Sequence, residues 1–156
     1  MALAIGIAVV GLGVVGGVQS TWAKGGSTKS RFEDLETAIQ KAGIRPKQPR
    51  EIPFAVKATR AAATEIPGGP RALQIDYIGE TDWITVTAFR GDVHWVSRQY
   101  DIVDVDLGNG IKAQYMENGE VQQLLWMDGD LTYHMVVGGT RREIPDLVRI
   151  ARSFAH

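Results

Sequence analysis

The chain has 156 residues, of which 44% are hydrophobic, so it is long enough for one domain with a buried core plus an attachment segment. Its formal net charge of -1 argues against nucleic acid as a partner. It contains no cysteine, which excludes disulfides and thiolate chemistry. Residues 24–60 hold nine basic and four acidic residues. We favour a solvated connector for this stretch, with contact to anionic lipid as the alternative.

The first 23 residues contain no charged side chain and consist largely of Ala, Val, Leu, Ile and Gly. As a helix they would span about 34 Å, enough to cross about 30 Å of hydrocarbon. We therefore expect 1–23 to be a membrane anchor or a cleaved signal segment, followed by a linker over 24–30. The nearest basic residues follow the apolar run, which taken literally places the rest of the chain in the cytoplasm. An outward orientation requires further residues before Met1, and we expect such residues.

Within this segment, Gly11, Gly13 and Gly16 spell the G-x-G-x-x-G spacing of a dinucleotide-binding loop. That motif needs a second strand ending in an acidic residue about 20 residues further on. No apolar strand follows before Arg31. The glycines are therefore interpreted as small residues of a membrane helix.

After the linker the sequence predicts one short helix and a stiff connection. Ser30 and Glu33 fit a capping box, and apolar residues follow at helical spacing up to Gly43, so we expect a helix over 31–42. Three prolines then make the chain extended. We expect a sheet to begin within 54–60 and a loop over 61–70, which ends in Pro-Gly-Gly-Pro.

The remaining sequence predicts strand after strand. Alternation and β-branched or aromatic residues indicate strands over 73–77 and 83–89. Turn dipeptides then recur at Asn109-Gly110, Asn118-Gly119, Asp128-Gly129 and Gly138-Gly139. Asn-Gly and Asp-Gly supply the positive φ angles that tight hairpins need. Together with the runs 111–117, 121–127 and 131–137, these turns predict an antiparallel meander.

Alternation also assigns the two faces of this sheet. The apolar side carries Val103, Val105, Leu107, Ile111, Ala113, Tyr115, Leu131, Tyr133, Met135 and Val137, and the polar side carries Lys112, Gln114, Gln122, Thr132 and His134. An apolar face needs a cover, and Pro145 with the apolar residues after it predicts a C-terminal helix in that role. The predicted class is α+β, with an antiparallel meander of about six or seven strands, covered on one face by one or two helices, in a single domain over 31–156.

Two stretches resemble a known family. Residues 35–54, LETAIQKAGIRPKQPREIPF, combine a short helix, a break and a proline pair. Residues 122–154, QQLLWMDGDLTYHMVVGGTRREIPDLVRIARSF, combine a Trp-bearing strand, a turn, Leu-Thr-Tyr and a closing helix. Together they are similar to the domain-of-unknown-function 4367 family. The resemblance implies a domain that follows a single membrane helix in bacterial proteins and faces outward, and it brings no catalytic residues.

Motifs for catalysis or metal binding are weak. His94 and His134 on one strand face would suit zinc, but no ligand cluster accompanies them. Asp101, Asp104 and Asp106 precede a glycine turn but miss the ligand spacing of a calcium loop, so a solvated edge strand is favoured. We therefore expect no enzyme activity, no metal and no cofactor.

Residues with large or aromatic side chains on the strands are the candidate partner-binding residues: Trp95, Tyr100, Trp126 and His134. Core packing is favoured for the aromatics, and the alternative is an apolar groove for a lipid, a peptide or a partner strand. The expected function is a non-enzymatic, membrane-anchored extracytoplasmic domain that binds or senses a protein or envelope component. The alternative is a lipid or lipoprotein carrier with an apolar cavity beneath its helices. A large cavity would favour the carrier, and a packed core with an exposed aromatic patch would favour the binder.

Overall fold

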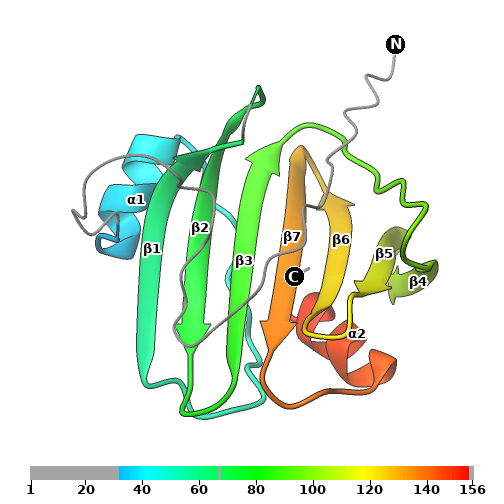
Figure 1. Cartoon of the computed structure of the whole chain (residues 1–156). Helices are drawn as coiled ribbons and strands as arrows, with labels where there is room; N and C mark the ends of the chain where they lie inside the picture. Colours follow the sequence, from blue (N-terminus) through cyan, green and yellow to red (C-terminus); the bar gives the residue numbers. More distant parts are fainter. Residues whose placement is uncertain (1–31, 67, 155–156) are drawn as a thin grey trace.

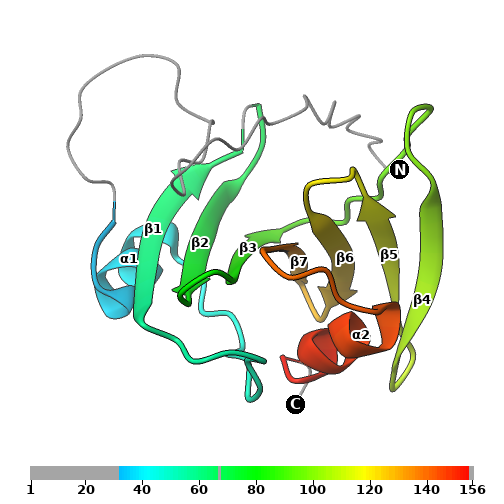
Figure 2. The same cartoon turned by 60° about the horizontal axis from the view of Figure 1, so that its bottom comes forward.

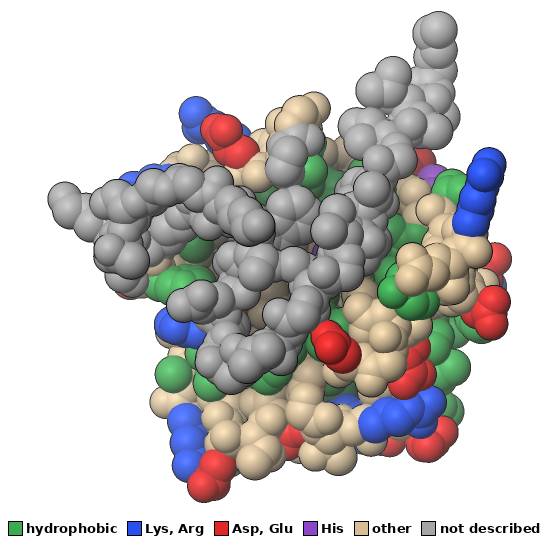
Figure 3. All heavy atoms as spheres, viewed as in Figure 1, with side chains coloured by type: hydrophobic (Ala, Val, Ile, Leu, Met, Phe, Trp, Pro, Cys, Tyr) green, Lys and Arg blue, Asp and Glu red, His purple; other side chains and the backbone are tan. Residues whose placement is uncertain are grey.

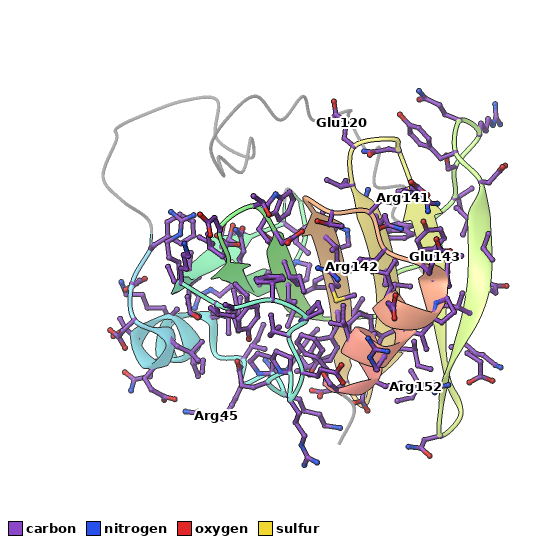
Figure 4. All side chains as sticks on the ribbon, turned by 90° about the horizontal axis from the view of Figure 1, so that it is seen from below. Arg45, Glu120, Arg141, Arg142, Glu143 and Arg152 are labelled. Atoms are coloured by element: carbon purple, nitrogen blue, oxygen red, sulfur yellow. The ribbon has the colours of Figure 1, made fainter. Side chains whose placement is uncertain are left out.

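The computed structural model describes residues 32–66 and 68–154, which form a seven-stranded antiparallel sheet with two helices on one side (Figures 1 and 4). The helices are α1, Leu35–Ala42, and α2, Ile144–Arg152. The strands are β1, Ala58–Glu65; β2, Arg71–Ile78; β3, Trp83–Arg90; β4, Ile102–Gly108; β5, Ile111–Glu117; β6, Gln122–Asp128; and β7, Leu131–Gly138. These elements confirm the predicted α+β class and open antiparallel sheet.

The predicted anchor or signal segment, residues 1–23, and the linker, residues 24–30, lie outside the described residues. Within the described part of the chain, neither helix is long and apolar enough to cross a membrane.

The order of the strands in the sheet is β1-β2-β3-β7-β6-β5-β4. Two meanders, β1 to β3 and β4 to β7, are joined where β3 pairs with β7, a pairing that the sequence did not predict. After β3, residues 91–101 carry the chain to the far edge of the sheet, where β4 begins (Figure 1). We call this stretch the crossover segment. The expected edge strand with Asp104 and Asp106 is therefore confirmed as β4.

The first helix begins later than predicted. Asp34, not Ser30, is the N-cap, because its Oδ1 accepts a hydrogen bond of 3.0 Å from the Thr37 amide. Glu33 lies outside the helix and its amide donates to the Ala61 carbonyl of β1 at 2.9 Å. Gly43 ends the helix in the left-handed conformation, with a φ of 67°, as the sequence predicts.

The expected loop over 61–70 is also wrong in its first half. Residues Ala58–Glu65 form β1, which pairs along its whole length with β2, for example Ala61 with Ile75. Alanine makes up four of the eight residues of β1 and carries only a weak intrinsic strand signal, so the neighbouring strand imposes the conformation. The strands of this hairpin end at Glu65 and resume at Arg71, and the expected sheet start within 54–60 falls at Ala58.

The apolar face of the sheet packs under the helices, as predicted from alternation. Val103 is the exception, with 44% of its surface exposed, because it lies on the edge strand. Gln122 was assigned to the wrong face. It shares the helix-covered face with Leu124 and Trp126, and it pairs with the core residue Val137.

The two helices lie apart over the sheet, and the connection between α1 and β1 runs between them (Figure 2). Residues of both helices and of this connection belong to the same core. Leu147 and Ile150 of α2 are fully buried, and the connection between α1 and β1 crosses the same face. Two tyrosine hydroxyls of the sheet fix this connection. The Tyr133 hydroxyl accepts from the Lys47 amide at 3.1 Å, and the Tyr77 hydroxyl donates to Gln48 at 2.7 Å.

Candidate functional site

Two of the four predicted binding residues meet on the helix-free face of the sheet. Trp95 of the crossover segment packs edge-on against His134 of β7, with ring centroids 5.4 Å apart. Trp95 is only 7% exposed and also packs against Met116 and Leu125. The pair therefore forms a small second core beneath the crossover segment.

Hydrogen bonds to the strands hold the crossover segment in place. The Gln114 side chain makes two hydrogen bonds with the main chain of Trp95. It accepts from the Trp95 amide at 2.7 Å and donates to the Trp95 carbonyl at 3.3 Å. The Thr132 hydroxyl donates to the Gly91 carbonyl at the start of the segment. These contacts satisfy polar groups that would otherwise be left unpaired between the segment and the sheet.

His134 is held as a neutral side chain. Burial lowers its pKa to about 4, and its Nε2 lies 2.9 Å from the Gln123 side-chain oxygen. The second histidine of the proposed pair, His94, is exposed in the crossover segment and lies beside Asp92, so the two histidines do not share a strand. Within the described residues, no group of three His, Asp or Glu side chains is placed to hold a metal.

Trp126 lies on the other face of the sheet, in the main core. Its ring stacks on Tyr133 with centroids 5.3 Å apart and planes inclined by 5°, and Phe154 meets it edge-on at 5.8 Å. It is 2% exposed. The structure therefore separates Trp126 from Trp95 and His134 by the thickness of the sheet.

Tyr100 lies just before β4, where it packs against the Trp95 cluster and also lines a solvent-open depression of about 410 Å³. We call this depression the β4 pocket, and its residues are Gln99, Tyr100, Asp101, Val103, Tyr115 and Glu117. Four of them belong to the end of the crossover segment and to β4, and two belong to β5. The pocket is thus built at the edge of the sheet, beyond the helices.

The floor of the β4 pocket is a fixed polar network. The Tyr115 hydroxyl donates to Glu117 at 2.8 Å and accepts from the Gln122 amide at 3.1 Å. Gln122 is itself locked to the main chain of Arg142, through bonds of 2.7 and 2.8 Å. Arg141 donates to both oxygens of Glu117, at 2.9 and 3.1 Å. Figure 4 shows the two arginines in the connection between β7 and α2.

This network fixes the charge states in the pocket. The hydrogen bond from Arg141, followed by that from Tyr115, lowers the pKa of Glu117. Burial raises the pKa of Tyr115. Glu117 is therefore an anion and Tyr115 a neutral phenol at neutral pH. A carboxylate of lowered pKa is a weak base and a phenol of raised pKa is a weak acid, so the pair suits binding better than proton transfer.

A separate buried polar cluster spans β1 to β3 on the helix-free face. Asp76 is 1% exposed, and its Oδ1 accepts from Gln74 at 3.0 Å and from Thr85 at 2.8 Å. Its Oδ2 lies 3.9 Å from the Arg60 guanidinium, which also sits over the Phe32 ring. The sequence did not predict this cluster, because its residues come from three strands and are brought together only by the fold. The Asp76 carboxylate and the Arg60 guanidinium face each other across the paired strands β2 and β1.

The described residues define the class of architecture, an open antiparallel sheet with helices on one side and a pocket at the β4 edge. No protein-family model, no curated protein and no solved structure matches this chain. The similarity to the domain-of-unknown-function 4367 family stays a prediction from the sequence.

Proposed function

We propose that this chain is a non-enzymatic, membrane-anchored extracytoplasmic domain that binds a protein partner, and that an extended segment of the partner pairs with β4. The observation that carries the proposal is the free edge of the sheet at β4, next to the β4 pocket. The anchor and the outward orientation rest on residues 1–23 and on the family resemblance.

An edge strand presents main-chain donors and acceptors that a strand of another chain can satisfy. In the described part of the chain, β4 pairs only with β5. Acidic side chains gather at the margin of the sheet over β4 in the space-filling view (Figure 3), and Asp101, Asp104 and Asp106 are all exposed. Exposed charges on an edge discourage pairing between identical copies, which favours a specific partner.

The packed core supports binding at the surface over carriage of a lipid inside the fold. Leu73, Ile84, Leu124, Met135 and Leu147 fill the space beneath the helices, each with no exposed surface. A carrier needs an apolar cavity that can take up a ligand of its size.

Site-specific photo-crosslinking tests the proposal in cells that make the full chain. A photoreactive phenylalanine at Val103 should capture a discrete partner protein. Val56 is the matched control, because it is also a valine and its exposure of 41% is close to the 44% of Val103. A protease added outside the cells, with a C-terminal tag as the readout, tests the orientation.

Capture from Val103 together with loss of the tag to external protease supports both parts of the proposal. Equal products from Val103 and Val56, or none from either, would contradict partner binding at β4. Complete protection of the tag until lysis would contradict the extracytoplasmic location.

A further inference from the structure

The two edges of the sheet are not equally available for pairing. At β1, the Glu33 amide already donates to the Ala61 carbonyl, and α1 lies alongside (Figures 1 and 2). At the end of β4, Arg152 of α2 donates to the carbonyls of Leu107 and Asp106, at 2.7 and 3.3 Å. Figure 4 shows Arg152 at this end of β4. Within the described residues, the free stretch of edge is therefore the first half of β4.

The β4 pocket adjoins this free stretch. Val103 belongs both to the open half of β4 and to the lining of the pocket. Side chains directly opposite each other on paired strands lie on the same face. A residue of a partner strand opposite Val103 therefore has its side chain beside Val103, at the mouth of the pocket.

The chemistry of the pocket selects a cationic side chain. Its lining offers two carboxylates, Asp101 and Glu117, and two phenol rings, Tyr100 and Tyr115. Arg141 neutralises Glu117, whereas Asp101 has no ion-pair partner among the described residues. Carboxylates form charge-assisted hydrogen bonds with Lys and Arg, and aromatic rings attract the same cations.

Charge also argues against a second copy of this chain as the occupant. Pairing the free half of β4 with the same stretch of another copy would bring Asp101 and Asp104 of the two chains close together. Like charges opposite each other destabilise a strand pair. The partner strand must therefore differ from β4 and carry positive charge.

We infer that the β4 pocket binds a Lys or Arg side chain of the extended partner segment that pairs with β4. This inference rests on the proposed function, since it identifies the partner segment by its chemistry. The main-chain bonds of β4 hold the segment, and the pocket selects for the cation.

A pair of labelled peptides tests this inference on the full chain in detergent micelles. The probe is a fluorescein-labelled octapeptide of alternating Thr and Val with one central Arg, and the control replaces the Arg by citrulline, which has nearly the same shape and no charge. Fluorescence anisotropy gives the two dissociation constants. We expect the Arg peptide to bind about tenfold more tightly, the size of one charge-assisted hydrogen bond, and the difference to shrink at high salt. N-methylation of alternate amides should abolish binding of both peptides, because it removes the strand pairing.

Two variants separate the pocket from the general acidity of the edge. Asp101→Asn removes the unpaired carboxylate of the pocket, and we expect it to abolish the preference for Arg over citrulline. Asp104→Asn removes the same charge three residues further on, from a β4 residue that does not line the pocket, and the preference should remain. Both residues are exposed, so neither change threatens the fold.

The outcomes separate the two proposals. Equal binding of the Arg and citrulline peptides, or an equal effect of the two Asn variants, would overturn the cation pocket and leave strand pairing at β4 intact. Failure of both peptides to bind at about 1 mM, a concentration that detects weak complexes, would overturn the inference, while capture from Val103 decides the proposed function on its own.

Discussion

Acidification probes the buried contact between Trp95 and His134. Burial lowers the pKa of His134 to about 4, from an ordinary value of 6.5. The unfolded chain therefore binds a proton at this histidine more readily than the folded chain does. Stability that is fully present above pH 6.5 is lost as the pH falls from about 6.5 toward 4.

The magnitude follows from the difference between the two pKa values. One unit of pKa corresponds to about 1.4 kcal/mol. His134 should therefore lower the free energy of unfolding by about 2 kcal/mol between pH 7 and pH 5. His134→Gln removes this titration and keeps a side chain that can hydrogen-bond to Gln123. The variant should lose about 2 kcal/mol less than the wild type over the same interval.

Urea denaturation of both proteins at pH 7.0 and pH 5.0 measures this difference. Carboxylates such as Asp82 and Glu117 have lowered pKa values and contribute stability that is lost mainly at more acidic pH. They are present in both proteins, so their contribution cancels. If the wild type and the variant lose the same free energy between the two pH values, burial does not hold His134 neutral and the reasoning is refuted.

Two further predictions concern the second core and the end of the last strand. Trp95→Ala should lower the free energy of unfolding by about 3 kcal/mol, because it removes the central side chain of the second core. The control is Val96→Ala, at a side chain that is 83% exposed. In the same urea titration it should change the free energy of unfolding by less than about 0.5 kcal/mol. Gly139→Ala should destabilise by at least about 2 kcal/mol more than Gly119→Ala. The two glycines have similar φ values of 92° and 86°, but only at Gly139 would a new Cβ lie 2.5 Å from the Thr81 carbonyl oxygen. Equal midpoints for either pair of variants would contradict the packing on which that prediction rests.

Local chemistry was enough to predict the hairpins of the second meander. Asn109 and Gly110 both have positive φ, 52° and 77°, as a type I′ turn requires, so this turn is determined by two adjacent residues. The alternation of the strands then assigned most of the core face correctly. Gln122 was not assigned to the core face because β6 begins with two glutamines, and the sequence does not show which of them faces solvent. Its partners, Tyr115 and Arg142, are brought to it only by the fold.

The pairing of β3 with β7 had no comparable local signal. It joins residues far apart in the sequence, such as Ile84 and Val137. One residue pair shows why it fits: Trp83 packs directly over Gly138, where any Cβ would clash with the indole ring. Gly138 had been interpreted only as part of a turn signal. Gly138 leaves room for the Trp83 indole ring, and this is apparent only when β3 and β7 are paired.

The crossover segment links the predicted binding residues to the pocket that we assign. Its middle is anchored on the helix-free face by Trp95, through His134 and Gln114. Its end is shaped by Ser97, whose hydroxyl accepts from the Tyr100 amide at 2.9 Å and so positions Tyr100 at the pocket. Trp95 and His134 thus lie outside the pocket. Their contact nevertheless positions the crossover segment, which leads to Tyr100 and to the free half of β4. On this basis Trp95→Ala should weaken peptide binding at β4 even under conditions where the domain remains folded.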